Sequence, residues 1–229
     1  MITVAQARPA QRAQFIRKTY MHLAGAVCAF VVLEFLLFKI GIAGTFTNWI
    51  LGNEFRWLLV LGAFIVIGWL SRGITSQTDS ITVQYLGLGI YTVTESLFFA
   101  PLLYIAAYFS DPSVIPTAGI LTILLFAGLT TVAFTTRSDF SIFDGILKLG
   151  GFVALGLIVC SIFFGFTLGL LFSLIMVVFA SIAILSDTSK VIHHYSPNQY
   201  VAASLELFAS VALLFWYLLR ILIALSSRR

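Results

Sequence analysis

Charged side chains are scarce in this sequence. Of its 229 residues, 10% are Asp, Glu, Lys or Arg, whereas 60% are hydrophobic and the mean hydropathy is +1.06. A soluble domain of this length cannot keep so much apolar surface away from water. The apolar runs are also too long and too unalternated for an outer-membrane barrel. The sequence therefore predicts an all-α membrane protein, in which lipid replaces water around the helices.

Cysteine is rare and the net charge is small. The two cysteines, Cys28 and Cys160, lie inside apolar runs, which favours small buried hydrophobic side chains over a disulfide bond. The formal net charge of +4 is spread over the ends of the apolar segments. This distribution indicates membrane topology and excludes a nucleic-acid-binding surface.

The few histidines are poorly placed for intramembrane catalysis. They are His22, His193 and His194, all near segment ends, and the sequence contains no G-x-S-x-G motif. An intramembrane serine protease needs a positioned histidine base. An aspartyl protease needs two catalytic aspartates, whereas the acidic neighbour of Asp187 is Glu206. The sequence therefore predicts a protein that is not an enzyme, with no resident cofactor and no firm metal site.

The longest uncharged run predicts two membrane-spanning segments in the C-terminal half of the chain. Leu149 to Ser186 is a stretch of 38 residues without Lys, Arg, Asp, Glu or His. At about 1.5 Å per helical residue, it is roughly twice the thickness of the hydrocarbon layer, so it predicts two membrane passes that divide near Gly165. Asp187 ends the run. A carboxylate on the last turns of such a helix needs a partner, a proton or a water-filled cavity.

Seven apolar segments follow from the whole chain, and they form a single domain over residues 19–225. The other five segments are Thr19–Ala43, Trp57–Leu70, Ile81–Phe109, Val114–Thr135 and Tyr200–Leu225. Residues 1–18 are a basic arm and residues 226–229 a short basic tail. Pro101 inside the third segment predicts a helix kink. We expect a seven-helix transmembrane bundle in a lipid bilayer.

Lys and Arg in the short loops predict a cytoplasmic N-terminus. Eight of them lie in the arm or beside the loops after the second, fourth and sixth segments: Arg8, Arg12, Arg17, Lys18, Arg72, Arg137, Lys148 and Lys190. The opposite loops have only Lys39 and Arg56. Seven passes place Arg228 and Arg229 outside, against this rule, and the alternative is a re-entrant last segment. We favour seven passes because the last segment is long enough to span.

Five short motifs, in order, resemble those of the Bax inhibitor-1 family, also called the TMBIM group, and its bacterial branch in particular. They are F-I-R-K-T-Y (Phe15–Tyr20), T-E-S-L-F-F-A-P (Thr94–Pro101), T-T-R-S-D-F-S (Thr135–Ser141), S-D-T-S (Ser186–Ser189) and L-L-R-I-L (Leu218–Leu222). The resemblance covers nearly the whole chain. It implies a bundle with a central last helix, a proton-sensitive calcium leak, and, for a bacterial protein, the inner cell membrane.

The resemblance also assigns roles to particular residues. Calcium-conducting members have an acid at the end of the sixth span, a second acid on the last span, and an arginine after the second span that can hold both acids as a latch. Asp187 matches the first acid and Arg72 the arginine. Ser210 stands at the position of the second acid. Glu206 lies one helical turn before Ser210, on the same helix face.

A hairpin of the last two segments predicts that Asp187 and Glu206 lie at similar depth. Two carboxylates at one site cannot both ionise cheaply, so a shared proton between them can act as a gate. The alternative places Glu206 among lipid headgroups with no specific role. Glu95, in the middle of the third segment, is either part of the ion pathway or a structural hydrogen-bond donor. Glu34 and Lys39 are expected to reach the membrane interface.

Two functions remain open at this point. In the first, the protein is a pH-sensitive cation (Ca²⁺) leak channel or exchanger, in which Asp187, Glu206, Ser210 and Glu95 supply a weak, transient calcium site. In the second, it is a non-conducting regulator that binds another membrane protein, such as a membrane protease. Small residues of the fifth segment, Gly145, Gly150, Gly151 and Gly156, suit close packing with a neighbouring helix.

Overall fold

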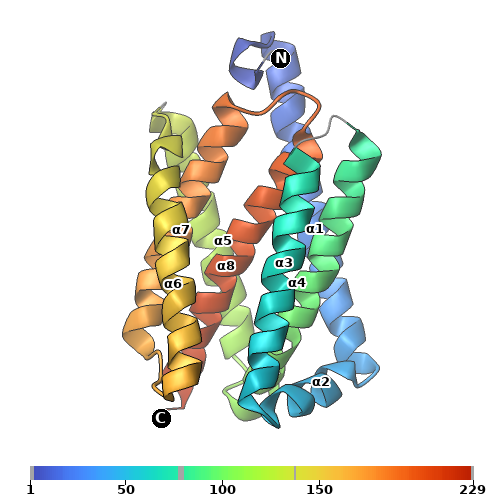
Figure 1. Ribbon diagram of the computed structural model, residues 1–229. Coiled ribbons are helices and arrows are strands. Elements are labelled where there is room, and N and C mark those ends of the chain that lie inside the picture. The colour runs from blue at the N-terminus through green and yellow to red at the C-terminus, as the bar shows by residue number, and fades with distance from the viewer. Residues whose placement is uncertain (1–2, 77–79, 137, 228–229) are drawn as a thin grey trace.

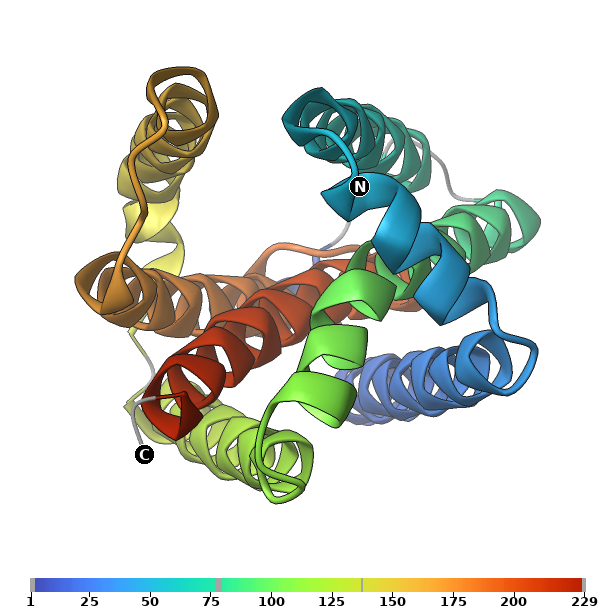
Figure 2. The ribbon, with the colours of Figure 1, turned by 90° about the horizontal axis from the view of Figure 1, so that it is seen from below.

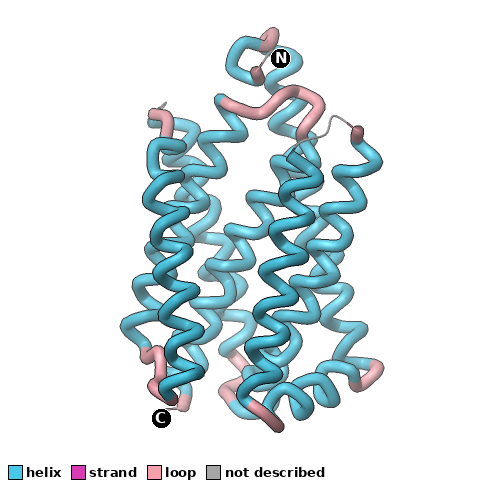
Figure 3. The backbone as a smooth tube through the Cα atoms, in the orientation of Figure 1, coloured by secondary structure: helices cyan, strands magenta, loops and turns pink. Residues whose placement is uncertain are grey.

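The computed structural model describes residues 3–76, 80–136 and 138–227, and seven long helices dominate it. The long helices are α1 (Pro9–Lys39), α3 (Glu54–Ser76), α4 (Ile81–Phe109), α5 (Val114–Thr136), α6 (Asp144–Phe164), α7 (Leu170–His193) and α8 (Tyr200–Ser226). The shorter elements are α2 (Ile42–Leu51) and the 3₁₀ turns η1 (Val4–Gln6) and η2 (Phe140–Phe143). The seven long helices are long and apolar enough to cross a membrane, and they run up and down in one bundle (Figures 1 and 3). The prediction of an all-α membrane protein is confirmed.

Helix α8 lies at the centre of the bundle. It packs against α1, α3, α4, α5 and α7, and in the view along the bundle it passes between its neighbours (Figure 2). Its side chains from Tyr200 to Leu219 are mostly buried around the whole circumference. A helix that is apolar on all sides is typical of such a position. The continuous helix crosses the whole bundle, which agrees with seven passes and not with a re-entrant last segment (Figure 1).

The division of the long apolar run agrees with the prediction. Helix α6 ends at Phe164, and Gly165 adopts a left-handed conformation with φ of 68° before α7 begins. Glycine tolerates this conformation because it has no Cβ. Helix α4 has the predicted bounds and continues through Pro101. The kink at Pro101 remains a prediction.

The first segment differs from its predicted bounds. Helix α1 begins at Pro9, so most of the basic arm is helical and continuous with the first span. The segment then turns at Gly41, whose φ is 79°, into the separate helix α2, which lies across the end of the bundle (Figure 1). The predicted span ended at Ala43, two residues into α2, and the rest of this helix was not predicted because an apolar run does not show where a helix turns.

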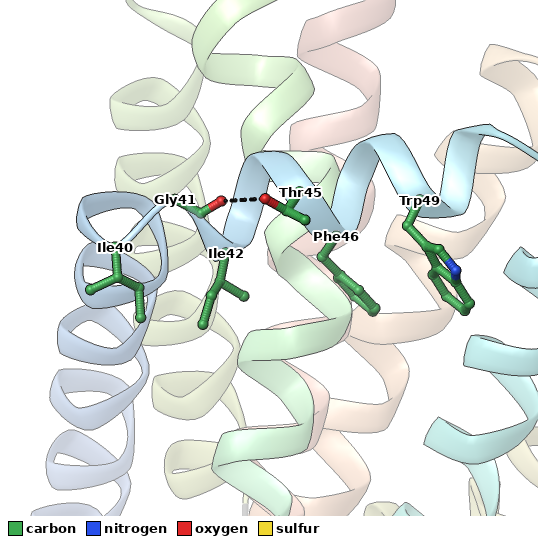
Figure 4. A pocket seen from close by; sticks show the side chains of 6 residues that line it. All are labelled: Ile40, Gly41, Ile42, Thr45, Phe46 and Trp49. Atoms are coloured by element: carbon green, nitrogen blue, oxygen red, sulfur yellow. Dashed lines mark hydrogen bonds between the residues drawn. The ribbon is translucent and has the colours of Figure 1, made fainter.

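Helix α2 has the features of an interfacial helix. Ile42, Phe46 and Trp49 of α2, with Ile40 just before it, line a shallow hollow (Figure 4). Ile40, Ile42 and Trp49 are exposed. Arg56 donates a hydrogen bond to the Trp49 carbonyl oxygen at 2.7 Å and lies over the indole ring. Aromatic and arginine side chains are favoured at this depth because one end of each is apolar and the other polar.

The opposite end of the bundle is closed by polar contacts to the loop between α7 and α8. The buried side chain of Gln84, on α4, accepts a hydrogen bond from the Ala202 backbone N–H and donates one to the Asn198 carbonyl, both at 3.2 Å. It thereby satisfies a free N–H group in the first turn of α8. The Val4 backbone N–H donates to the Tyr195 carbonyl at 2.8 Å, which attaches the N-terminal turn to the same loop.

Two minor predictions are wrong. Cys28 and Cys160 are free, as expected, but both side chains are exposed on the outer surface of the bundle rather than buried. An exposed thiol there faces lipid, which costs little. Glu34 was expected at the membrane interface but is buried in the bundle, whereas Lys39 is exposed. The helix face, and not the distance from the helix end, decides the burial of Glu34.

Candidate functional site

The predicted site lies where the ends of α3 and α7 meet the first turns of α8. Arg72 is near the end of α3, Asp187 is in the last turns of α7, and Glu206 and Ser210 are on successive turns of α8. The antiparallel packing of α7 on α8 brings these positions to one level of the bundle. The site is therefore near the end that carries the N-terminus (Figure 1).

Asp187 is held by a serine and a lysine. The Ser210 hydroxyl donates a hydrogen bond to Asp187 Oδ2 at 2.5 Å, and Lys190 Nζ lies 3.1 Å from Asp187 Oδ1. Only 7% of Asp187 is exposed, and the two contacts supply the partners that a buried carboxylate requires. Ser210, which replaces an acid in the resemblance, thus contacts the predicted first acid directly.

Lys190 connects the site to α6. Its Nζ also lies 2.9 Å from Asp144 Oδ1, and the Ser186 hydroxyl donates to the same oxygen at 2.6 Å. Asp144, Ser186 and Lys190 were not predicted as site residues. The spacing of three residues between Asp187 and Lys190 was a usable signal, because side chains at i and i+3 are neighbours on a helix. Nothing local in the sequence indicated Asp144.

Arg72 lies beside Glu206. Its Nη1 is 3.7 Å from Glu206 Oε2, which is ion-pair distance but too long for a hydrogen bond. The exposed fractions of the two side chains are 44% and 26%, so water screens this pair. Arg72 also lies over the ring of Tyr91, and its Nη2 is 3.4 Å from the Tyr91 hydroxyl. The predicted latch arginine therefore contacts the second predicted acid, Glu206, while Lys190 serves the first.

Asp187 and Glu206 each have a cationic partner. The contacts form two neighbouring ion-pair groups, Asp144 and Asp187 with Lys190, and Glu206 with Arg72. We call these five residues together the acidic cluster. With every group ionised, the cluster carries one excess negative charge. A single added proton makes it neutral. The shared proton itself remains a prediction.

Glu95 extends the polar groups into the bundle. It lies on α4, one turn after Tyr91, and the Tyr91 hydroxyl interacts with both Arg72 and Glu95. Only 3% of Glu95 is exposed, and its Oε2 has no hydrogen-bond partner within the described part of the chain. A structural acid that donates to Ser or Thr of a neighbouring helix was the alternative. The neighbour in the structure is instead a tyrosine of the same helix.

The ability of these acids to hold a metal ion depends on how many ligands lie together. Within residues 3–76, 80–136 and 138–227, no group of three or more His, Cys, Asp and Glu side chains could hold a metal ion. Calcium favours six to eight oxygen ligands. Asp187, Glu206 and Ser210 supply only part of such a set.

Two of the sequence motifs meet beside the site. Asp139, from Thr135–Ser141, accepts hydrogen bonds from the Ser189 hydroxyl at 3.0 Å and the Ser141 backbone N–H at 3.0 Å, and its Oδ2 lies 2.8 Å from His194 Nε2. Partial desolvation would raise the pKa of Asp139, but these hydrogen bonds outweigh it and hold the pKa well below its ordinary value. The contacts attach the loop before α6 to the end of α7.

The fold and the site together define a polytopic helical membrane protein with a partly buried acidic cluster at one end. Residues 12–228 match the family model described as inhibitor of apoptosis-promoting Bax1. The chain belongs to the Bax inhibitor-1 family. The family resemblance of the five motifs is thereby confirmed.

Individual relatives agree with this assignment. Protein lifeguard 4 of Mus musculus is 28% identical over 98% of this chain and 91% of its own length. Bax inhibitor 1 of Schizosaccharomyces pombe is 28% identical over 96% of this chain and 79% of its own length. An uncharacterized protein of Pseudomonas aeruginosa is 41% identical over 48% of this chain, and the match spans about half of that relative (49%). The last match is consistent with a bacterial branch.

Proposed function

We propose that this protein is a pH-sensitive cation leak channel or exchanger that passes Ca²⁺, with no enzymatic activity. The observation that carries the proposal is the row of polar groups that begins at one end of the bundle and reaches into its interior. It runs from Asp144, Lys190 and Asp187 to Glu206 and Arg72, and through Tyr91 to Glu95. Ionisable groups within a membrane span are costly and mark pathways for ions or protons.

The gate in this proposal is one proton shared by Asp187 and Glu206. With the proton present, the acidic cluster is neutral and compact. When the proton leaves, the two carboxylates repel each other, and the excess negative charge attracts a divalent cation. The leak therefore increases as the pH rises.

Calcium flux into liposomes tests the proposal. Purified protein is reconstituted into vesicles that contain a calcium dye, and the calcium flux is recorded at about pH 6 and about pH 8. We expect a proton shared by two carboxylates to be lost between these two pH values. We expect calcium entry that is at least several-fold faster at the higher pH. Protein-free liposomes are the control, and equal leakage with and without protein would contradict the proposal.

The regulator hypothesis is supported by a different observation. Ala154 is the one buried residue of α6 in the described part of the chain, although α6 is as long as a span. Gly150 contacts Phe179 on α7, while Gly145 and Gly156 have open space beside them. A span with an open face of small residues suits a second membrane protein. Absence of flux, together with a partner that crosslinks to α6, would favour this second function.

A further inference from the structure

Glu34, on α1, is a buried acid without a partner. Its exposed fraction is 7%, and neither carboxylate oxygen has a hydrogen-bond partner within the described part of the chain. Burial of an unpaired carboxylate is one of the most costly events in a protein interior, so the neutral, protonated form is the one that this position can hold. Such a group calls for an explanation beyond packing.

The surroundings of Glu34 are aromatic on both sides. The buried stripe of α1 faces α4 and α8 and ends with Phe30 and Glu34. One turn before Glu34, the Phe30 ring lies 5.2 Å from Phe99 and 6.2 Å from Phe208, centroid to centroid. We call these three rings the Phe30 layer.

One turn after Glu34 lies a second group of rings. Phe38 lies 6.2 Å from Tyr104 and 6.4 Å from Tyr108, centroid to centroid. A Cβ added to Gly44 of α2 would lie 3.3 Å from the Tyr104 hydroxyl oxygen, so this hydroxyl reaches the interfacial helix. Glu34 therefore has the Phe30 layer on its inner side and tyrosines on the side of α2.

The register of α1 on α4 places Glu34 relative to Glu95. The two helices run in the same direction (Figure 1), and Phe30 lies opposite Phe99. The same register places Ala26 opposite Glu95. Ala26 and Glu34 are two turns apart on α1, so the two acids are separated by about 12 Å along the bundle. The Phe30 layer lies between them.

Few other ionisable groups face Glu34. On α4 they are Tyr104 and Tyr108, and helix α2 contains no charged residue. On α8 the charged residues are Glu206, which lies toward the other end, and Arg220, whose guanidinium donates to the Leu168 carbonyl. On α1 itself Lys39 is exposed. The proton on Glu34 is therefore its own and is not shared with a neighbouring acid.

We propose that Glu34 is a second proton-exchanging acid of the ion pathway, on the far side of the Phe30 layer from Glu95. This inference rests on the proposed function. In each cycle, one proton reaches the Glu34 carboxylate when the Phe30 layer opens to the Glu95 side. The same proton leaves to water past Tyr104 at the end covered by α2. The donor is the protonated Glu95 carboxyl: its O–H bond breaks and the O–H bond of Glu34 forms, with water carrying the proton between them, and Glu95 then takes up another proton from the side of the acidic cluster. Glu34 alternates between neutral acid and single negative charge.

The closed Phe30 layer explains why the two acids do not exchange protons continuously. A separation of about 12 Å is too long for one hydrogen bond, which joins atoms roughly 3 Å apart. The rings offer no polar atom on which a water molecule could rest. Rotation of Phe30 or Phe99 is thus the step that admits water and joins the two sides.

Variants of Glu34 test the inference in proteoliposomes that contain a pH-sensitive dye and a calcium dye. Glu34→Gln keeps the shape but cannot release a proton, and we expect proton flux to fall at least about ten-fold, which corresponds to roughly 1.4 kcal/mol in the barrier. Glu34→Asp keeps the acid and should retain a substantial part of the flux. Phe30→Ala, which opens the layer, should raise the flux several-fold.

The outcomes separate this inference from the proposed function. Flux in the wild type with an unchanged rate and pH dependence in Glu34→Gln would overturn the role of Glu34 and leave the proposed function intact. No flux in the wild type would reject the proposed function. If the wild type shows no flux, or if Glu34→Gln does not fold, the infrared C=O stretch of protonated carboxyl groups tests whether Glu34 exchanges its proton. A band that shifts in D₂O in wild type and changes frequency in Glu34→Asp supports proton exchange at Glu34, and an unexchanged band overturns it.

Discussion

At the scale of single residues, Asp187 and Glu206 carry the sharpest prediction. Each has its own cation, yet one excess negative charge remains in the cluster that they share with Asp144. If one proton controls that charge, Asp187→Asn and Glu206→Gln should each abolish the pH dependence of calcium flux. The double variant should add little, because members of one network are not additive.

Flux measurements on the three variants across pH check this prediction. Glu95→Gln is a matched control, because it neutralises an acid of the same pathway outside the acidic cluster. We expect it to lower the flux and leave the pH profile in place. A pH response that survives Glu206→Gln but disappears in Asp187→Asn would show that Asp187 acts without Glu206, either alone or with Ser210.

Asp139 predicts a loss of stability in acid. Its pKa is depressed in the folded state, so its contribution is present above the unfolded pKa of about 3.9 and is lost as the pH falls through the lower folded value. The side chain is 42% exposed, so we expect only about 1 kcal/mol at neutral pH. Asp139→Asn should lower the melting temperature in detergent at about pH 7 and make it less sensitive to acid. If wild type and variant have equal melting temperatures at neutral pH and again at acidic pH, the stabilising role of the Asp139 carboxylate is contradicted.

The acids could be picked out from the sequence by their charge, whereas their surroundings could not be predicted. Asp187, Glu206 and Glu95 stood out because an acid in an apolar run is rare. Glu34 was misplaced, because its distance from the helix end suggested an interface. The cost of burying it becomes visible only when α4 and α8 cover that helix face. Asp144 was missed because it reaches Lys190 only through tertiary packing.

At the scale of elements, the turn between α6 and α7 depends on one glycine. Gly165 has φ of 68° and nothing near the position of a Cβ, so Gly165→Ala meets backbone strain without a steric clash. We expect this change to destabilise the protein by about 1–2 kcal/mol. Gly156→Ala is the matched control, since Gly156 also has open space but lies in the middle of α6. It should be neutral or stabilising by up to about 1 kcal/mol.

Thermal unfolding of both variants in one detergent measures the difference. A smaller loss for Gly165→Ala than for Gly156→Ala would show that the turn does not need its left-handed residue. The prediction belongs to the element, because neither glycine touches the acidic cluster. Its result therefore reports on the turn alone.

Helix bounds were predictable where a turn-forming residue or a polar loop interrupts the apolar sequence. Gly165 divided the long apolar run correctly, and α4 and α5 began at the predicted residues. Helix α2 was not foreseen, because apolarity is shared by spanning and interfacial helices and the turn at Gly41 is a single residue. The polar arm was separated from α1 because charge marks the membrane boundary but does not end a helix.

At the scale of the whole molecule, α8 requires the two ends of the chain to lie on opposite sides of the membrane. With a cytoplasmic N-terminus, as the positive-inside rule predicts, a reporter fused after Arg229 should report the outer side. A reporter fused before Met1 is the paired control and should report the cytoplasm. Two cytoplasmic reporters would require the last segment to turn back, against the continuous helix from Tyr200 to Ser226.

The attachment of the N-terminal turn has a consequence for biosynthesis. Val4 is fully buried and its backbone N–H bonds to the Tyr195 carbonyl, so its partner lies in a loop that is made almost two hundred residues later. The contact forms only after α7 has been inserted, and until then the arm is unprotected outside the membrane. The arm should therefore be cleaved by protease in a cell until the hairpin of α7 and α8 is complete, and be protected afterwards. Protection of the arm then reports that the C-terminal hairpin has formed.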